Sequence, residues 1–341
     1  MRNKLILAFL AALAASAQAP IESIGIPRIG SIEFYGLRKV SPQLARQALG
    51  LSVGSLLPAS AGETEDRLAD IDQIAAARIE AVCCENGAIV LYVGVEERGS
   101  PRYDVQPAPG GAEELPPEIR TTYQDFQTAR HAAELRGATA EDLTKGHPLS
   151  PDPAVRAFQA RFPSLVTENL DVLRQVLRNS GDEYQRATAA YLLAYAPNKN
   201  EVVEDLRQAL ADNDPVVRAN SVHNLTALAL LERADAGSRV RVSPTWFIDL
   251  LQSVVWSDRT KAAWALATLT EDRDVFTLSR LRGPALEALI EMAAWKTRAH
   301  ARSAFVLLGR AAGIEEAVIE AAWTRDDRQP ILEAAAKLVR R

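Results

Sequence analysis

The segment Asp214-Pro215-Val216-Val217-Arg218 decides the fold of this 341-residue chain, because it recurs. A related segment is Asp152-Pro153-Ala154-Val155-Arg156, and the same Asp-to-Arg spacing joins Asp182 to Arg186. An aspartate before a proline begins a helix: the carboxylate accepts hydrogen bonds from free N–H groups, and proline needs no partner there. We expect Asp152, Asp182 and Asp214 to cap helices, with Arg156, Arg186 and Arg218 one turn later and within reach of them.

Recurrence also favours a structural role over a catalytic one, because an active site is needed once and a cap is needed in every repeat. Four alanines stand six residues before a leucine: Ala187, Ala219, Ala263 and Ala301. The repeated Asp–Arg and Ala–Leu spacings together predict paired helices at 164–178 with 183–196, 200–211 with 215–231, 244–256 with 258–271, 284–295 with 297–312, and 314–323 with 327–340. A less regular leading pair is expected at 117–136 and 153–162, and a charged insert at about 232–243.

This combination of period, Asp-Pro-x-Val-Arg and paired helices resembles HEAT repeats. The resemblance implies a mostly α fold, a right-handed α-solenoid of HEAT-like helical pairs over residues 118–341. Such a stack presents a long concave surface, and in this architecture that surface usually binds another protein.

Residues 30–97 follow a different pattern, a small α/β domain in the order βααββ. Ile32 and Phe34 alternate as a strand, and Ser41-Pro42 begins a helix. A second helix is expected at 63–74. Two strands follow at 78–84 and 88–96, joined by Asn86-Gly87, which favours a tight hairpin.

This order resembles the POTRA module of outer-membrane assembly factors. Residues 32–36, Val40, residues 49–54 and residues 93–97 carry the resemblance. It implies that the domain binds a peptide or a partner strand at a sheet edge. No series of alternating ten-residue strands follows, so barrel insertion is not implied.

The N-terminus has the pattern of a secretion signal, with Arg2 and Lys4 before the apolar run 5–15. We expect a signal peptide over residues 1–17, cleavage after Ala17 and a periplasmic or otherwise exported protein; an uncleaved membrane anchor is the alternative. The chain from residue 18 onward has 37 basic and 44 acidic side chains, a net charge of −7, and no basic block, which argues against nucleic acid as a partner. No later apolar run is long enough for a transmembrane helix.

Residues 98–117 are rich in proline and glycine and predict an extended linker between the two domains. Cys83 and Cys84 are the only cysteines. Neighbouring side chains on a strand point to opposite faces, so a bond between them is disfavoured; a vicinal disulfide or redox switch remains open, and whether they are reduced, paired or reactive stays undecided.

Catalytic motifs are missing from the sequence, which contains no G-x-S-x-G, phosphate-binding loop or G-x-G-x-x-G. His131, His147, His223 and His300 are scattered without metal-ligand spacing, so we expect no metal, no cofactor and no enzyme. An enzyme would require His223 or His300 beside a carboxylate in a polar pocket.

The candidate protein-binding residues are large aromatics and nearby cations near the ends of predicted helices. As an aromatic ladder and a basic patch they would contact a protein or peptide; as core residues and a solvated face they would not. They are Trp256, Trp295, Trp323, Arg298 and Arg302. The sequence therefore predicts a non-enzymatic interaction scaffold, or alternatively an accessory factor of an envelope-biogenesis, outer-membrane assembly or cell-division complex. The oligomeric state and the partner stay open.

Overall fold

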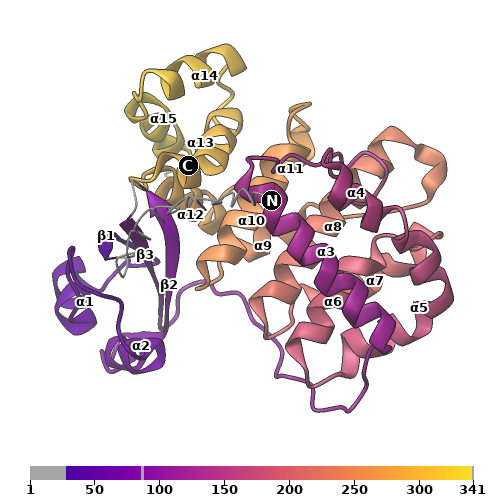
Figure 1. The fold of residues 1–341 in the computed structure, drawn as a ribbon. Coiled ribbons are helices and arrows are strands. Elements are labelled where there is room, and N and C mark those ends of the chain that lie inside the picture. The colour runs from indigo at the N-terminus through magenta and orange to yellow at the C-terminus, as the bar shows by residue number, and fades with distance from the viewer. Residues whose placement is uncertain (1–27, 86–87, 340–341) are drawn as a thin grey trace, which may run out of the picture.

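A computed structural model describes residues 28–85 and 88–339 (Figure 1). It confirms the predicted fold class: a small three-stranded sheet with two helices precedes a mostly helical array. The predicted signal peptide, residues 1–17, lies outside the described residues. Within the described residues no helix is both long and apolar enough to cross a bilayer.

The N-terminal domain has the predicted element order. Strand β3 lies at the centre of the sheet, parallel to β1 and antiparallel to β2. Its elements are β1 (Ile29–Tyr35), α1 (Pro42–Leu49), α2 (Ala61–Ala69), β2 (Ile74–Glu85) and β3 (Ala88–Glu97). Helix α2 is shorter than expected, because the chain enters β2 at Ile74. Cys83 and Cys84 fall on β2, and their side chains are not among those described.

One face of this sheet carries the domain's own core. Leu49 of α1 and Leu68 of α2 pack with Leu91, Val93 and Val95 of β3, and all five are buried. The alternation of β3 therefore puts these three residues on the helix-covered face, as the period of a strand requires. The opposite face carries Tyr92 and Gly94, and its contacts are described below.

The helical array consists of antiparallel pairs that follow one another along the chain (Figure 1). The elements are α3 (Pro117–Leu135), α4 (Pro153–Gln159), α5 (Phe162–Asn179), α6 (Glu183–Leu193), η1 (Lys199–Val202), α7 (Val203–Ala209), α8 (Pro215–Ala234), η2 (Ala236–Ser238), α9 (Thr245–Leu250), α10 (Trp256–Leu269), α11 (Val275–Arg280), α12 (Pro284–Ala293), α13 (Arg298–Ala311), α14 (Glu316–Thr324) and α15 (Gln329–Val339).

Two elements of the helical array, α9 and α11, also differ from the prediction. Helix α9 ends at Leu250, so Trp256 begins the second helix of its pair instead of ending the first. Helix α11 was not predicted. Its cap is Asp274, whose side chain accepts the N–H of Thr277 at 2.7 Å, but its residues Val275 and Phe276 are exposed and give no apolar periodicity to detect.

The three aspartates of the repeated motif accept hydrogen bonds from the first turns of α4, α6 and α8. Asp152 accepts from Ala154 N at 3.0 Å, Asp182 from Gln185 N at 3.0 Å, and Asp214 from Val216 N at 2.9 Å. These bonds satisfy N–H groups that have no partner inside their helix.

The arginines do not pair with the aspartate of their own motif, which corrects the prediction. Arg186 binds Asp212 of the next repeat through two nitrogens, at 2.8 and 2.9 Å. Arg218 likewise binds Asp258 of α10, at 2.9 Å from its Nε. A side chain that reaches across the repeat boundary ties neighbours together, so the motif stabilises the stack and not only the single helix. Arg156 makes no ion pair with the described residues, and Asp152 instead binds Arg136 at 2.6 Å.

The proline- and glycine-rich segment from 98 to 116 is extended and mostly exposed, yet it is bonded to the array at several points. Tyr103 Oη donates to the carbonyl of Leu210 at 3.0 Å, and Gln106 N donates to that of Ala211 at 2.7 Å. Gly111 N donates to Asn179 O at 2.8 Å, and Leu115 is buried. The segment therefore runs along the side of the stack and returns the chain to α3.

Candidate functional site: the domain interface and the groove

The second face of the N-terminal sheet packs against the late repeats. Tyr92 of β3 stacks on Trp256, with ring centroids 5.0 Å apart and planes at 25°, and lies 4.8 Å from the ring of Trp295. Tyr35 of β1 meets Trp295 edge-on at 5.9 Å. The domain that precedes α3 in sequence thus docks on α10, α12 and α13 (Figure 1).

Polar contacts accompany these rings. Tyr35 Oη donates to the carbonyl of Val254 at 2.8 Å, and Tyr92 Oη lies 2.7 Å from His300 Nδ1. Gly36 N donates to Glu291 at 3.2 Å. A buried tyrosine hydroxyl without a hydrogen-bond partner costs free energy. Because both hydroxyls have partners here, the two domains can pack tightly with these tyrosines buried between them.

Glu80 of the N-terminal domain contacts the first turn of helix α10. Helix α10 has no side-chain cap of its own, because Val255 occupies the position that Asp214 holds in the preceding repeat. Glu80 Oε1, from β2, accepts the N–H groups of Trp256 and Ser257. Burial raises the pKa of Glu80, and these backbone hydrogen bonds act against that rise. The N-terminal domain supplies the missing cap of this repeat.

Gly94 permits the approach of the two domains. A Cβ atom at this position would lie 2.0 Å from the carbonyl oxygen of Val254 and 2.6 Å from Tyr35 Oη. Only a residue without a side chain fits between the sheet and the turn before α10.

These contacts settle where the candidate tryptophans lie. Trp295 is 2% exposed and Trp323 is 8% exposed, so neither offers a surface to a partner, and Trp256 is half-buried beneath Tyr92. Arg298 and Arg302 lie over the ring of Trp323 at 5.0 and 5.6 Å. Trp256 and Trp295 lie in the domain interface and Trp323 lies beneath the two arginines, so the three tryptophans do not form an exposed aromatic ladder. The side chains of Arg298 and Arg302 remain partly exposed.

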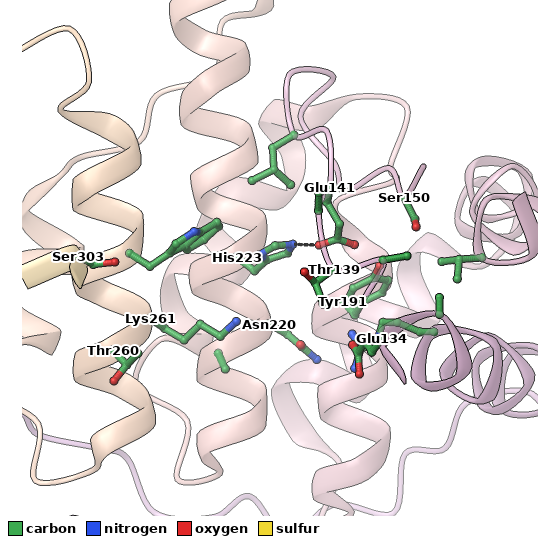
Figure 2. A pocket seen from close by; sticks show the side chains of 18 of the residues that line it. Glu134, Thr139, Glu141, Ser150, Tyr191, Asn220, His223, Thr260, Lys261 and Ser303 are labelled. Atoms are coloured by element: carbon green, nitrogen blue, oxygen red, sulfur yellow. Dashed lines mark ion pairs between the residues drawn. The ribbon is translucent and has the colours of Figure 1, made fainter. Parts of the chain in front are cut away.

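A groove lies on the inner face of the array, with a volume of about 750 Å³. Second helices of successive pairs form its floor, and α3 with the 138–150 segment forms one wall (Figure 2). The floor is lined by Tyr191 of α6, by Ala219, Asn220 and His223 of α8, by Thr260, Lys261 and Trp264 of α10, and by Ala299 and Ser303 of α13.

His223 and Glu141 form an ion pair across this groove, 2.9 Å from Nε2 to Oε2 (Figure 2). Burial favours the neutral form of Glu141, but the hydrogen bond and charge of His223 outweigh it and lower the pKa of the carboxyl group. His223 also stacks on Trp264, with centroids 5.3 Å apart and planes at 20°. The imidazole is thereby held between a carboxylate and an indole.

This geometry meets the condition that would favour an enzyme, a histidine beside a carboxylate in a polar pocket. His223 Nδ1 has no hydrogen-bond partner, so no serine, threonine or cysteine of the described chain is held as a nucleophile on it. Within the described residues no group of three or more His, Cys, Asp or Glu side chains could hold a metal ion.

Sequence reasoning missed most of the groove, including Glu141 and Lys261. A signal for it was present. Counting five residues onward from Arg186, Arg218 and Arg259 gives Tyr191, His223 and Trp264, and all three line the groove. The position five residues after each of these arginines therefore predicts a residue on the inner face of the repeats.

Comparison with known families agrees with this geometry. Residues 170–267 match the family model of HEAT repeats. The match spans α5 to α10 and so contains both Arg–Asp pairs between repeats and the centre of the groove. HEAT repeats suggest a protein-interaction scaffold. A search of the curated proteins finds no match to the chain.

Proposed function

We propose that this chain is an exported, non-enzymatic scaffold that binds a segment of a partner protein in the groove. The groove carries the proposal, because it crosses the inner helices α6, α8, α10 and α13 of four successive pairs. With helices packed about 8–10 Å apart, three spacings span roughly 25–30 Å. An extended chain of about eight residues has that length at about 3.3 Å per residue.

The non-enzymatic part of the proposal is supported by the way the polar side chains of the groove are used. His223 is engaged by Glu141, and Arg130 of α3 pairs with Glu134 at 3.5 Å. Side chains paired in this way shape and orient a surface, whereas a catalytic base needs a nucleophile or water positioned beside it.

A second contact through the N-terminal domain belongs to the same proposal. The domain has the element order of a POTRA module, and both faces of its sheet are covered, so an added partner strand has only an edge to join. The beginning of β1 is bonded to residues 54–56, and Ile79 N of β2 already donates to Glu65 at 2.9 Å. The rest of β2, toward Glu85, is the edge that we assign to a partner strand.

Site-specific photo-crosslinking tests the groove. Benzoylphenylalanine at position 299, exposed in the groove, should form an adduct with a partner protein in cells. The same group at position 317, exposed on the outer helix α14, is the matched control and should form none. Adducts from 317 alone, or from neither position, would contradict the proposal. Mass spectrometry of the chain from a periplasmic extract tests export, with Gln18 expected as the first residue.

A further inference from the structure

Lys261 is the cation of the groove that has no acidic partner. Its ammonium lies over the ring of Trp264, 5.7 Å from the centroid, and no carboxylate of the described residues lies within ion-pair distance. Figure 2 shows the side chain reaching from α10 toward the middle of the groove, in the direction of Asn220 and His223. It is therefore placed where an occupant of the groove would pass.

Three buried arginines of the array differ from Lys261 in this respect. Arg186 and Arg218 are each paired with an aspartate of the following repeat, and Arg259 with Glu291 at 3.2 Å. The two acids whose charges act on Lys261 are also committed, Glu141 to His223 and Glu134 to Arg130. These buried arginines are thus satisfied within the array, whereas Lys261 in the groove is left without a carboxylate.

The walls of the groove desolvate part of this ammonium, although the side chain as a whole is exposed. Burial lowers the pKa of Lys261, and the charge of Arg130 lowers it further, whereas Glu141 and Glu134 act in the opposite direction. A carboxylate arriving from outside would form a charge-assisted hydrogen bond with this ammonium, and such a bond is strongest where water is partly excluded.

We propose that Lys261 recognises the side-chain carboxylate of an aspartate or glutamate in the extended partner segment that the groove holds. The inference rests on the proposed function and adds the chemistry of the occupant. A neutral or basic side chain at that point would leave the ammonium without a carboxylate, so Lys261 sets a preference for an acidic segment of the partner.

Two pools of labelled octapeptides test it by fluorescence anisotropy. Both have blocked ends and the same mixture of residues at six positions; the central two are Glu in one pool and Gln in the other. The Glu pool should bind at least about tenfold more tightly, since a hydrogen bond to a charged group contributes about that much. Lys261→Met should remove the difference and Lys261→Arg should keep it. Lys337→Met, exposed on α15, is the charge-matched control and should behave as the wild type.

The outcomes separate the two proposals. Equal binding of both pools, lost in Ala299→Trp, would overturn the role of Lys261 and leave the groove as a binding site. A Glu preference that survives Lys261→Met would also overturn it. Binding of neither pool would overturn the carboxylate preference, and the crosslink from position 299 would still decide the proposed function. Thermal unfolding of each variant confirms that it is folded.

Discussion

Tyr92 of the N-terminal domain stacks on Trp256 of the repeat array, with ring centroids 5.0 Å apart. This contact joins segments that are separated by the linker and by α3 to α9. The sequence predicts two domains joined by a linker, whereas in the structure they pack against each other as a single scaffold. Deleting residues 30–97 would accordingly expose Trp256 and Trp295, so substitutions at the interface are a cleaner test of the domain's role than its removal.

Gly94→Ala should separate the two domains. The added methyl group would meet the Val254 carbonyl oxygen at 2.0 Å, which the backbone must move to relieve. We expect earlier cleavage of the 98–116 segment by a protease and altered tryptophan fluorescence. Gly62→Ala is the control, because its methyl group would meet only Ser60 Oγ at 3.9 Å. Equal protease resistance of both variants and the wild type would contradict the tight approach at Gly94.

Glu80→Ala should destabilise the chain as a missing cap does. Its carboxylate accepts the first N–H groups of α10 from another domain. We expect the free energy of unfolding to fall by about 0.5–2 kcal/mol, measured by urea denaturation. Asp214→Ala removes the equivalent cap within a repeat and should cost a similar amount. If Asp214→Ala is costly and Glu80→Ala is neutral, the capping role of Glu80 is wrong.

Arg218→Met should be among the most destabilising substitutions. Arg218 and Asp258 are both almost completely buried, and losing the cation leaves an unpaired carboxylate whose pKa burial already raises. We expect a loss of about 3–5 kcal/mol in the free energy of unfolding. The double variant Arg218→Met, Asp258→Leu should recover much of that loss. Additive losses would show that the two side chains do not act as a pair.

Glu97 should contribute to stability at neutral pH and lose its contribution in acid. Burial disfavours its charge, but hydrogen bonds from the N–H groups of Val40, Arg38 and Lys39 outweigh burial and lower its pKa. A lowered folded-state pKa means that the stabilisation is complete above the ordinary value of 4.5 and is lost as pH falls through the folded-state value.

Glu97→Gln tests this by urea denaturation at several pH values. The variant should be less stable than the wild type at pH 7, by about 1.5–3 kcal/mol. The gap should narrow as the pH falls below 4.5 and close once the pH passes below the lowered folded-state pKa of Glu97, because both chains then carry a neutral side chain at this position. A gap that stays constant from pH 7 to pH 3 would contradict the charged role of Glu97.

The parts of the fold that were predictable are those with local causes. Asp152, Asp182 and Asp214 signal helix starts through the bonds that their own side chains make. The tight turn predicted at Asn86-Gly87 lies outside the described residues. The partners of Arg186 and Arg218 were not predictable in this way, since each lies in the next repeat and depends on how the pairs stack.

The sequence contains only a weak indication of the interface between the two domains. Val90 and Tyr92 alternate with Ile89, Leu91 and Val93, so β3 is apolar on both faces, a pattern typical of a strand covered on both sides. That pattern indicates a second covering layer and does not say which part of the chain supplies it. The groove was harder still, because Glu141 comes from an irregular segment that only the folded array brings to His223.

The affinity of the partner captured from position 299 tests the central claim most directly. It should be measured by titration calorimetry against the wild type, Ala299→Trp, which fills the groove, and Ala317→Trp, which adds the same ring to the outer face. Our account predicts at least about a tenfold loss of affinity in the first variant, equivalent to about 1.4 kcal/mol, and no change in the second. Equal affinity for all three proteins would contradict it.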